Sequence, residues 1–193
     1  MTQTFQGWKD LTGQLETKNT GANAAAFAVY RGTGWAYEFD NVRLREAFIV
    51  YHVPHDYTPG TDMYVHAHWS QIVVDTGGPA GVPGNCKWSF DISHAKAFGT
   101  PGGAADAFRA PKTTSVIQQG STTQFGHMLA EVPFTSHDGS TTLFEHSEFE
   151  IDGVIMLRVY RDAGDVSDTL NQSAFLHFVD IHYQSQAGGT PKR

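Results

Sequence analysis

From residue 27 almost to its end, the chain alternates short runs rich in Val, Ile, Tyr, Phe and Trp with clusters of Gly, Pro, Asp and Ser. Runs of this length and composition are typical of β-strands, whereas an amphipathic helix needs an apolar period of 3.6 residues over a longer stretch. The pattern therefore predicts about nine strands and no helix. The expected strands cover residues 27–31, 35–39, 46–53, 62–74, 87–97, 113–118, 127–134, 149–161 and 174–184.

Two of these segments carry bulky residues on both faces. In the strand expected over 149–161, Met156 and Leu157 point to opposite faces, which predicts a central strand that is covered on both sides. In the last expected strand, one face is shared by Leu176, Phe178, Asp180 and His182. Long antiparallel strands with Gly- and Pro-rich connections predict an all-β fold, a β-sandwich of the jelly-roll type.

The chain divides into a terminal arm, one domain and a tail. Its 193 residues are enough for one domain that buries roughly 70% of the surface of the unfolded chain. Residues 17–26 are small and polar, and over residues 1–26 we expect an extended N-terminal arm with a short ordered piece around Trp8 and Leu11. The sandwich is expected over 27–185, and 186–193 is expected to be a flexible C-terminal tail.

Composition excludes several classes of protein. The formal net charge of -7 argues against nucleic acid as a partner, because phosphate contacts require a basic surface. No apolar run approaches the roughly 20 residues that span a bilayer, and the N-terminus lacks an export-signal pattern, so we expect no membrane partner. The one cysteine, Cys86, excludes an internal disulfide and is expected to be a small, half-buried residue. Only 17% of the residues are charged, which favours a surface that contacts other protein.

Histidine is the residue type that most suggests chemistry, with ten in the chain. His66 and His68 lie two positions apart in an expected strand, so their rings share a face. Together with His182 they are the candidate metal ligands. However, the cupin metal motif places a glutamate three or four positions after its His-x-His, and residues 71–73 are Gln, Ile and Val. We therefore expect hydrogen-bonded histidines, with no metal and no cofactor.

The sequence gives little indication of catalytic groups. The chain has no Gly-x-Ser-x-Gly motif for a nucleophilic serine. The pairs Glu145 with Glu148 and Asp165 with Asp168 have the residue types that glycosidases use, but their place in loops favours solvated turn acids. We therefore expect no enzyme.

Aromatic residues leave one alternative open. A platform that stacks against sugars could be formed by Trp35, Tyr37, Tyr51, Tyr57 and Tyr64. Aromatic side chains at alternating strand positions more commonly belong to a core.

Three blocks of sequence carry a resemblance to a known family. They are residues 53–62 continuing into 64–69, residues 122–128 with Glu131 beyond, and residues 175–185. In this order they resemble a family of small structural proteins from tailed bacteriophage virions, over a stretch from about Trp8 to the C-terminus.

This resemblance implies a non-enzymatic virion component, first of all a capsid decoration (cement) protein. Such a protein is jelly-roll-like, is made in the host cytoplasm, forms a homotrimer and binds the major capsid protein on the outer capsid surface. Alternatives are a tail, collar or fibre-attachment component, or a surface carbohydrate-binding module. The candidate subunit or capsid contacts are Trp8, Leu11, His55, Asp56, Tyr57, His66 and His68. Near a threefold axis, His66, His68 and His182 would form a hydrogen-bonded knot or a metal clamp between chains.

Overall fold

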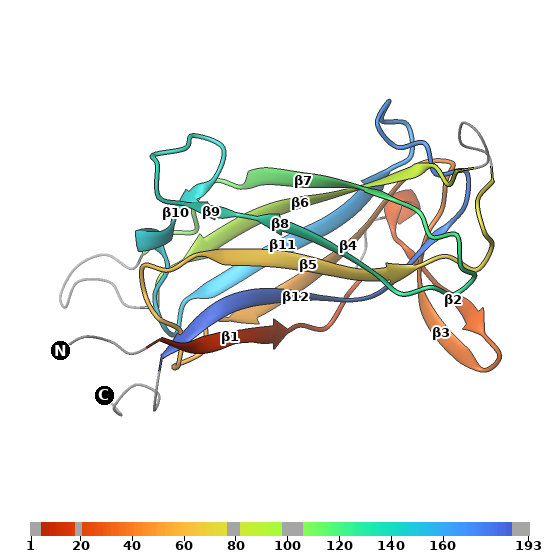
Figure 1. Ribbon diagram of the computed structural model, residues 1–193. Coiled ribbons are helices and arrows are strands. Elements are labelled where there is room, and N and C mark those ends of the chain that lie inside the picture. Colours follow the sequence, from red (N-terminus) through yellow and green to blue (C-terminus); the bar gives the residue numbers. More distant parts are fainter. Residues whose placement is uncertain (1–4, 18–20, 77–81, 98–105, 187–193) are drawn as a thin grey trace.

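The structure is a computed structural model that describes residues 5–17, 21–76, 82–97 and 106–186. Two antiparallel sheets pack face to face in it (Figure 1). The strands are β1 Phe5–Thr12, β2 Ala26–Arg31, β3 Gly34–Phe39, β4 Leu44–His52, β5 Met63–Ser70, β6 Asn85–Ala95, β7 Lys112–Gln119, β8 Met128–Pro133, β9 Thr135–Ser136, β10 Phe144–Glu145, β11 Val154–Asp162 and β12 Ala174–Gln186. The described helices are the 3-10 turns Gly21–Asn23 and His146–Glu148, and none of them could span a bilayer.

The chain passes repeatedly between the two sheets. The first sheet has the order β2-β3-β12-β5-β8, with β1 paired along the second half of β12, and the second has the order β4-β11-β6-β7. The chain therefore crosses from one sheet to the other at β3 to β4, β4 to β5, β5 to β6, β7 to β8, β8 to β11 by way of β9 and β10, and β11 to β12. This connectivity is a β-sandwich of the jelly-roll type, as the sequence predicts.

The inner faces of both sheets form one core. Trp88 on β6 contacts Trp69 on β5 and Phe39 on β3, with ring centroids 5.8 and 5.1 Å apart. The Tyr51 hydroxyl crosses the core and donates to the Val179 carbonyl at 2.8 Å. Cys86 is fully buried in the core rather than half-buried, and this burial raises the pKa of its thiol.

All nine expected strands are present, and β1, β9 and β10 are additional. β1 pairs with β12 from Trp8 opposite Gln184 to Thr12 opposite Asp180. The ordered piece expected around Trp8 and Leu11 is therefore present as β1, but residues 5–12 belong to the first sheet rather than to a separate arm. Sequence pattern misses such an edge strand because backbone hydrogen bonds hold a polar sequence in place. Residues 1–4 and 18–20 of the expected arm, and 187–193 of the expected tail, lie outside the described residues.

The segment after β1 crosses to the other sheet. Glu16 pairs with Phe48 and Ala24 with Glu46, so the chain lies along the edge of β4. A side chain at Gly13 would meet the Ile49 side chain, because a Cβ there would lie 2.2 Å from its Cγ2. This close approach explains a glycine at the crossing point.

A bulge in β12 changes its predicted faces. The pairing with β5 shifts register between Leu176 and Phe178. Leu176 consequently lies in the core, while Phe178 is partly exposed on the outer face. The prediction that Leu176 shares the face of Phe178, Asp180 and His182 is wrong, because one extra residue reverses the alternation.

Candidate functional site

Four neighbouring strands place histidines and carboxylates in a row on the outer face of the first sheet. Opposite His66 on β5 lie Asp180 on β12 and Glu131 on β8, and opposite His182 on β12 lies Asp10 on β1. Figure 1 shows β1, β12, β5 and β8 side by side in this order. We call this surface the histidine face. It comprises Trp8, Asp10, His66, His68, His127, Glu131, Asp180 and His182.

Asp180 lies between two imidazoles at the centre of the histidine face. Its Oδ1 is 3.1 Å from Nδ1 of His66, and its Oδ2 is 3.0 Å from Nε2 of His68. The Asp180 side chain is only 2% exposed. These contacts are close but poorly aligned, so Oδ1 of Asp180 and Nε2 of His68 have no hydrogen-bond partner among the described residues.

The opposite nitrogen of each ring has a well-formed partner. Nε2 of His66 is 2.7 Å from Oε2 of Glu131, and Nδ1 of His68 is 3.0 Å from Nε2 of His127. Stacking also holds the rings, since His68 lies 4.0 Å from Phe178 between centroids. The two imidazoles are thus fixed in orientation from outside the Asp180 site.

The pKa values of the neighbouring His66 and His68 are shifted in opposite directions. Burial lowers the pKa of His66, but its contacts with Asp180 and Glu131 outweigh burial and leave that pKa raised. For His68, burial lowers the pKa, and the charges of His127 and His66 lower it further against the attraction of Asp180. Proximity to Asp180 alone therefore does not decide the protonation of either ring.

The third metal-ligand candidate from the sequence occupies a different position. His182 stacks on His66 and on Trp8, with centroids 4.9 and 4.8 Å apart. Its Nδ1 contacts Asp10 Oδ1 at 2.6 Å. The residues that sequence reasoning missed are the carboxylates Asp10, Glu131 and Asp180, which only the strand register brings to the histidines.

The other contact candidates from the sequence differ in exposure. Trp8 is exposed, Leu11 packs partly against the core, and His55 is an exposed residue that pairs with Asp152. The Asp56 carboxylate accepts a hydrogen bond from the Tyr183 hydroxyl at 2.8 Å and pairs with Lys9. Tyr57 is fully buried and donates to the Thr61 carbonyl. The interface role predicted for Tyr57 is therefore corrected to a core role.

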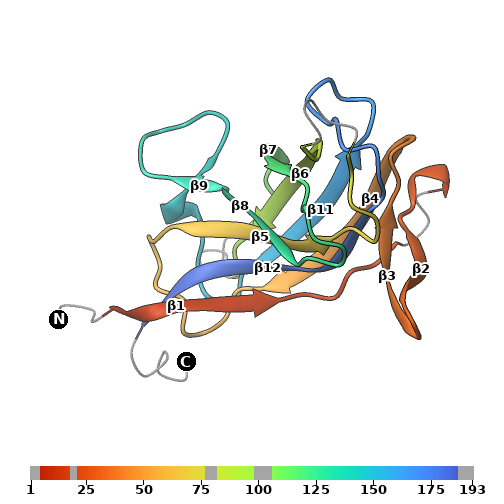
Figure 2. The same cartoon turned by 45° about the vertical axis from the view of Figure 1, so that its right-hand side comes forward.

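An apolar stripe covers one face of the β2–β3 hairpin. Phe27 and Val29 on β2 lie opposite Tyr37 and Trp35 on β3, and the Phe27 and Trp35 rings stack 5.7 Å apart. Phe27, Val29 and Trp35 are 60%, 52% and 55% exposed. Figures 1 and 2 show the hairpin protruding from one end of the sandwich.

The hairpin is anchored by its other face. The Tyr30 ring packs against Phe175 and His177, with centroids 5.4 and 4.9 Å apart. The Ser70 hydroxyl donates to the Tyr30 hydroxyl at 2.7 Å. The hairpin that carries the apolar stripe is therefore fixed to the sandwich.

The outer face of the second sheet is open rather than covered. Met156 on β11 is exposed there and lines a hollow of about 400 Å³ with Phe48 and Val50 of β4. Arg158 borders the hollow and donates to Asp91 Oδ2 at 2.8 Å. The prediction that this strand is covered on both faces is wrong, because no described segment packs on its outer side.

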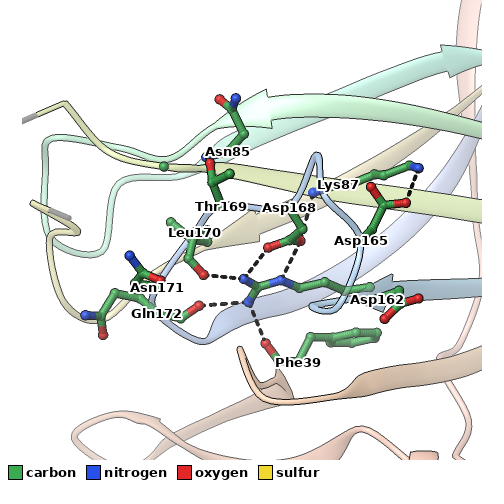
Figure 3. Close-up of polar contacts among 12 residues, drawn as sticks. Phe39, Asn85, Lys87, Asp162, Asp165, Asp168, Thr169, Leu170, Asn171 and Gln172 are labelled. Atoms are coloured by element: carbon green, nitrogen blue, oxygen red, sulfur yellow. Dashed lines mark hydrogen bonds and ion pairs between the residues drawn. The ribbon is translucent and has the colours of Figure 1, made fainter. Parts of the chain in front are cut away.

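A buried ion pair closes the end of the sandwich near the loop after β11. Nε and Nη2 of Arg161 donate to the two oxygens of Asp168 at 2.9 and 2.8 Å, and the two side chains are 0% and 1% exposed. The remaining guanidinium hydrogens go to the carbonyls of Phe39, Leu170 and Gln172 (Figure 3). Asp168 is thus a buried structural group, and the prediction of a solvated turn acid is wrong for it.

Comparison with known proteins gives likenesses of structure only. No family model and no curated protein matches the chain. A family 61 carbohydrate-binding module in complex with β-1,4-galactotriose is 11% identical, with 94% of this chain and 92% of that chain covered and a TM-score of 0.34. A family 35 module from Cellvibrio japonicus is 12% identical, with 95% of each chain covered and a TM-score of 0.38.

A third similar structure comes from a virus. The stem and receptor-binding domain of spike protein P1 from bacteriophage PM2 is 13% identical, with 83% of this chain and 66% of that chain covered and a TM-score of 0.27. At these identities and TM-scores, none of the three carries an inference about what this chain binds.

Proposed function

We propose that this chain is a non-enzymatic structural protein of a bacteriophage particle, and that it decorates the capsid by binding the major capsid protein. The observation that carries the proposal is the apolar stripe of Phe27, Val29, Trp35 and Tyr37 on the anchored β2–β3 hairpin, of which the first three are exposed. The sequence blocks that resemble virion structural proteins support a place in a bacteriophage particle. The apolar stripe supports attachment to another protein.

The stripe has the character of a protein contact. Burial of a large apolar side chain contributes roughly 1.5–3 kcal/mol, so a cluster of exposed ones favours association. The one hydroxyl on the stripe, that of Tyr37, donates to the Leu15 carbonyl at 3.1 Å. A small polar ligand needs convergent hydrogen-bonding groups, and the four stripe side chains offer little for this purpose.

Trimer formation belongs to the same proposal. Three copies that dock together turn the second and third contacts into intramolecular ones, so weak single contacts give stable attachment. A protein that binds only the mature shell also stabilises that shell by mass action. Light scattering after size exclusion tests this part, and a monomer at all concentrations would contradict it.

The test of attachment uses a double variant, Phe27→Ser with Trp35→Ser. Shells that lack the protein are mixed with wild-type or variant chains and sedimented. We expect the double variant to remain folded and to bind the shell at least about tenfold more weakly, because the loss of even one apolar contact of about 1.4 kcal/mol corresponds to a factor of ten.

The matched control is Val166→Ser, which removes an exposed apolar side chain elsewhere on the molecule. It should be retained like the wild type. Equal retention of the double variant and the control would overturn the role of the hairpin.

A second candidate function is carbohydrate binding through the same hairpin. The observation that favours it is the exposed, stacked pair of rings of Phe27 and Trp35, inclined by 25°. A glycan array separates the two functions. Glycan binding that Trp35→Ser abolishes would support this candidate, whereas an array without signal would remove it.

A further inference from the structure

We propose that His66, His68 and Asp180 bind a divalent transition-metal ion of the zinc type. Two imidazoles and one carboxylate are a donor set that zinc and its neighbours prefer. One ring nitrogen of His66, one of His68 and a carboxylate oxygen of Asp180 all lie within 4.8 Å of one another, and the nitrogens nearest Asp180 are Nδ1 of His66 and Nε2 of His68. The inference is independent of the role proposed for the hairpin.

The unsatisfied atoms at the centre point to a ligand. Oδ1 of Asp180 and Nε2 of His68 are buried and have no hydrogen-bond partner among the described residues. Buried polar atoms in proteins are nearly always paired, because an unpaired one loses its hydration without compensation. An ion between the three side chains would satisfy the imidazole lone pairs and the carboxylate together.

The spacing requires only small side-chain movements. The carboxylate oxygens lie 3.0–3.1 Å from the two ring nitrogens. A tetrahedral ion bound at about 2.0–2.1 Å separates its donors by about 3.3 Å. A modest opening of the three side chains is therefore enough to admit the ion.

The outer partners prepare the nitrogens that face the site. Glu131 can accept only from a protonated Nε2 of His66, and in the neutral ring this leaves the lone pair on Nδ1. Likewise, a proton on Nδ1 of His68 donated to His127 leaves the lone pair on Nε2. Carboxylates and other acceptors behind the histidine ligands of metal sites have this orienting role.

The neighbouring cluster of Asp10, His66 and His182 is a weaker alternative. Its donor atoms also lie within 4.8 Å of one another. However, Asp10 and His182 already contact each other at 2.6 Å, and Asp10 is exposed. Because Asp10 and His182 already have each other as partners, the site of His66, His68 and Asp180 is the better candidate for a metal ion.

The test uses the full chain without an affinity tag, stripped with EDTA and dialysed. Titration with Zn²⁺ should give one ion per chain, and Co²⁺ should give the visible absorption of a tetrahedral or five-coordinate site. His68→Phe keeps the stack with Phe178 but removes the nitrogen, and Asp180→Asn removes the charge. Both should weaken Zn²⁺ affinity more than Glu131→Gln, which should lose about 10–100-fold.

His55→Gln is the matched control, since it changes a histidine that pairs with a carboxylate elsewhere. It should bind Zn²⁺ like the wild type. A stoichiometry well below one ion per chain, or equal affinity of His68→Phe and wild type, would overturn the proposal. The wild-type Co²⁺ spectrum keeps the test decisive if a variant fails to fold.

Discussion

The side chains of Asp168 and Asp180 are almost fully buried against basic side chains, yet their surroundings differ. Asp168 accepts two aligned hydrogen bonds from Arg161 and one from the Lys87 backbone at 3.0 Å. Asp180 has two imidazoles at similar distances, but its Oδ1 has no aligned donor. The comparison shows that burial and charge alone do not identify a functional carboxylate. A saturated set of hydrogen bonds indicates a structural role, and an unsaturated one indicates room for a ligand.

The largest expected effect follows from breaking the saturated pair. Asp168→Asn keeps the shape of the side chain but leaves the Arg161 guanidinium buried without its counter-charge. We expect a loss of about 3–5 kcal/mol in the free energy of unfolding, as when one partner of a buried ion pair is removed. Urea denaturation followed by tryptophan fluorescence measures it. A loss below about 1 kcal/mol would mean that the carbonyls alone hold Arg161.

The corresponding change in the unsaturated site should have a smaller effect. In EDTA, Asp180→Asn removes a charge whose Oδ1 is without an aligned hydrogen bond. We expect a loss of about 1–2 kcal/mol, well below that of Asp168→Asn, in the same urea experiment. If the two losses were equal, Asp180 would be a structural anchor like Asp168.

The sequence predicts the fold better than it predicts either aspartate's role. Alternation and composition locate the nine main strands and place His66 and His68 on one face. They do not locate Asp180 or Glu131 beside these histidines, because pairing between strands more than 60 residues apart fixes the register. Likewise, nothing in the polar loop after residue 161 predicts that Asp168 turns inward to Arg161.

His94 is a third buried titratable group, and unlike the two aspartates it is buried in its neutral form. His94 is buried against Phe144 and Phe149, with ring centroids 4.7 and 4.3 Å apart. Glu148, Arg109 and Asp106 are the charged groups that act on it. Burial is the main cause that lowers the pKa of His94, so the folded chain resists the proton that the unfolded chain takes up near pH 6.5.

The sign of the pH dependence follows from this shift. At pH 7.5, His94 is neutral in both states and contributes little. As the pH falls below about 6.5, the unfolded state binds the proton first, and this lowers the free energy of unfolding by up to about 1.4 kcal/mol per pH unit. His94→Phe should flatten the fall in unfolding free energy between pH 6.5 and 5.5 relative to wild type. Parallel curves for the two proteins would contradict a neutral, buried His94.

The smallest effect is expected at Asp165, which lies three residues before Asp168 and bears the same charge. Asp165 pairs with Lys87, and both side chains are partly exposed to solvent (Figure 3). The Lys87 contact is the first cause that lowers the pKa of the Asp165 carboxyl. Because solvent screens this pair and both side chains lose entropy in forming it, Asp165→Asn should leave the urea midpoint unchanged within error. The same substitution therefore compares two aspartates of one loop that differ in burial and in hydrogen-bond partners. A shift as large as that of Asp168→Asn would show instead that the whole loop, rather than the Arg161 pair, holds this end of the sandwich.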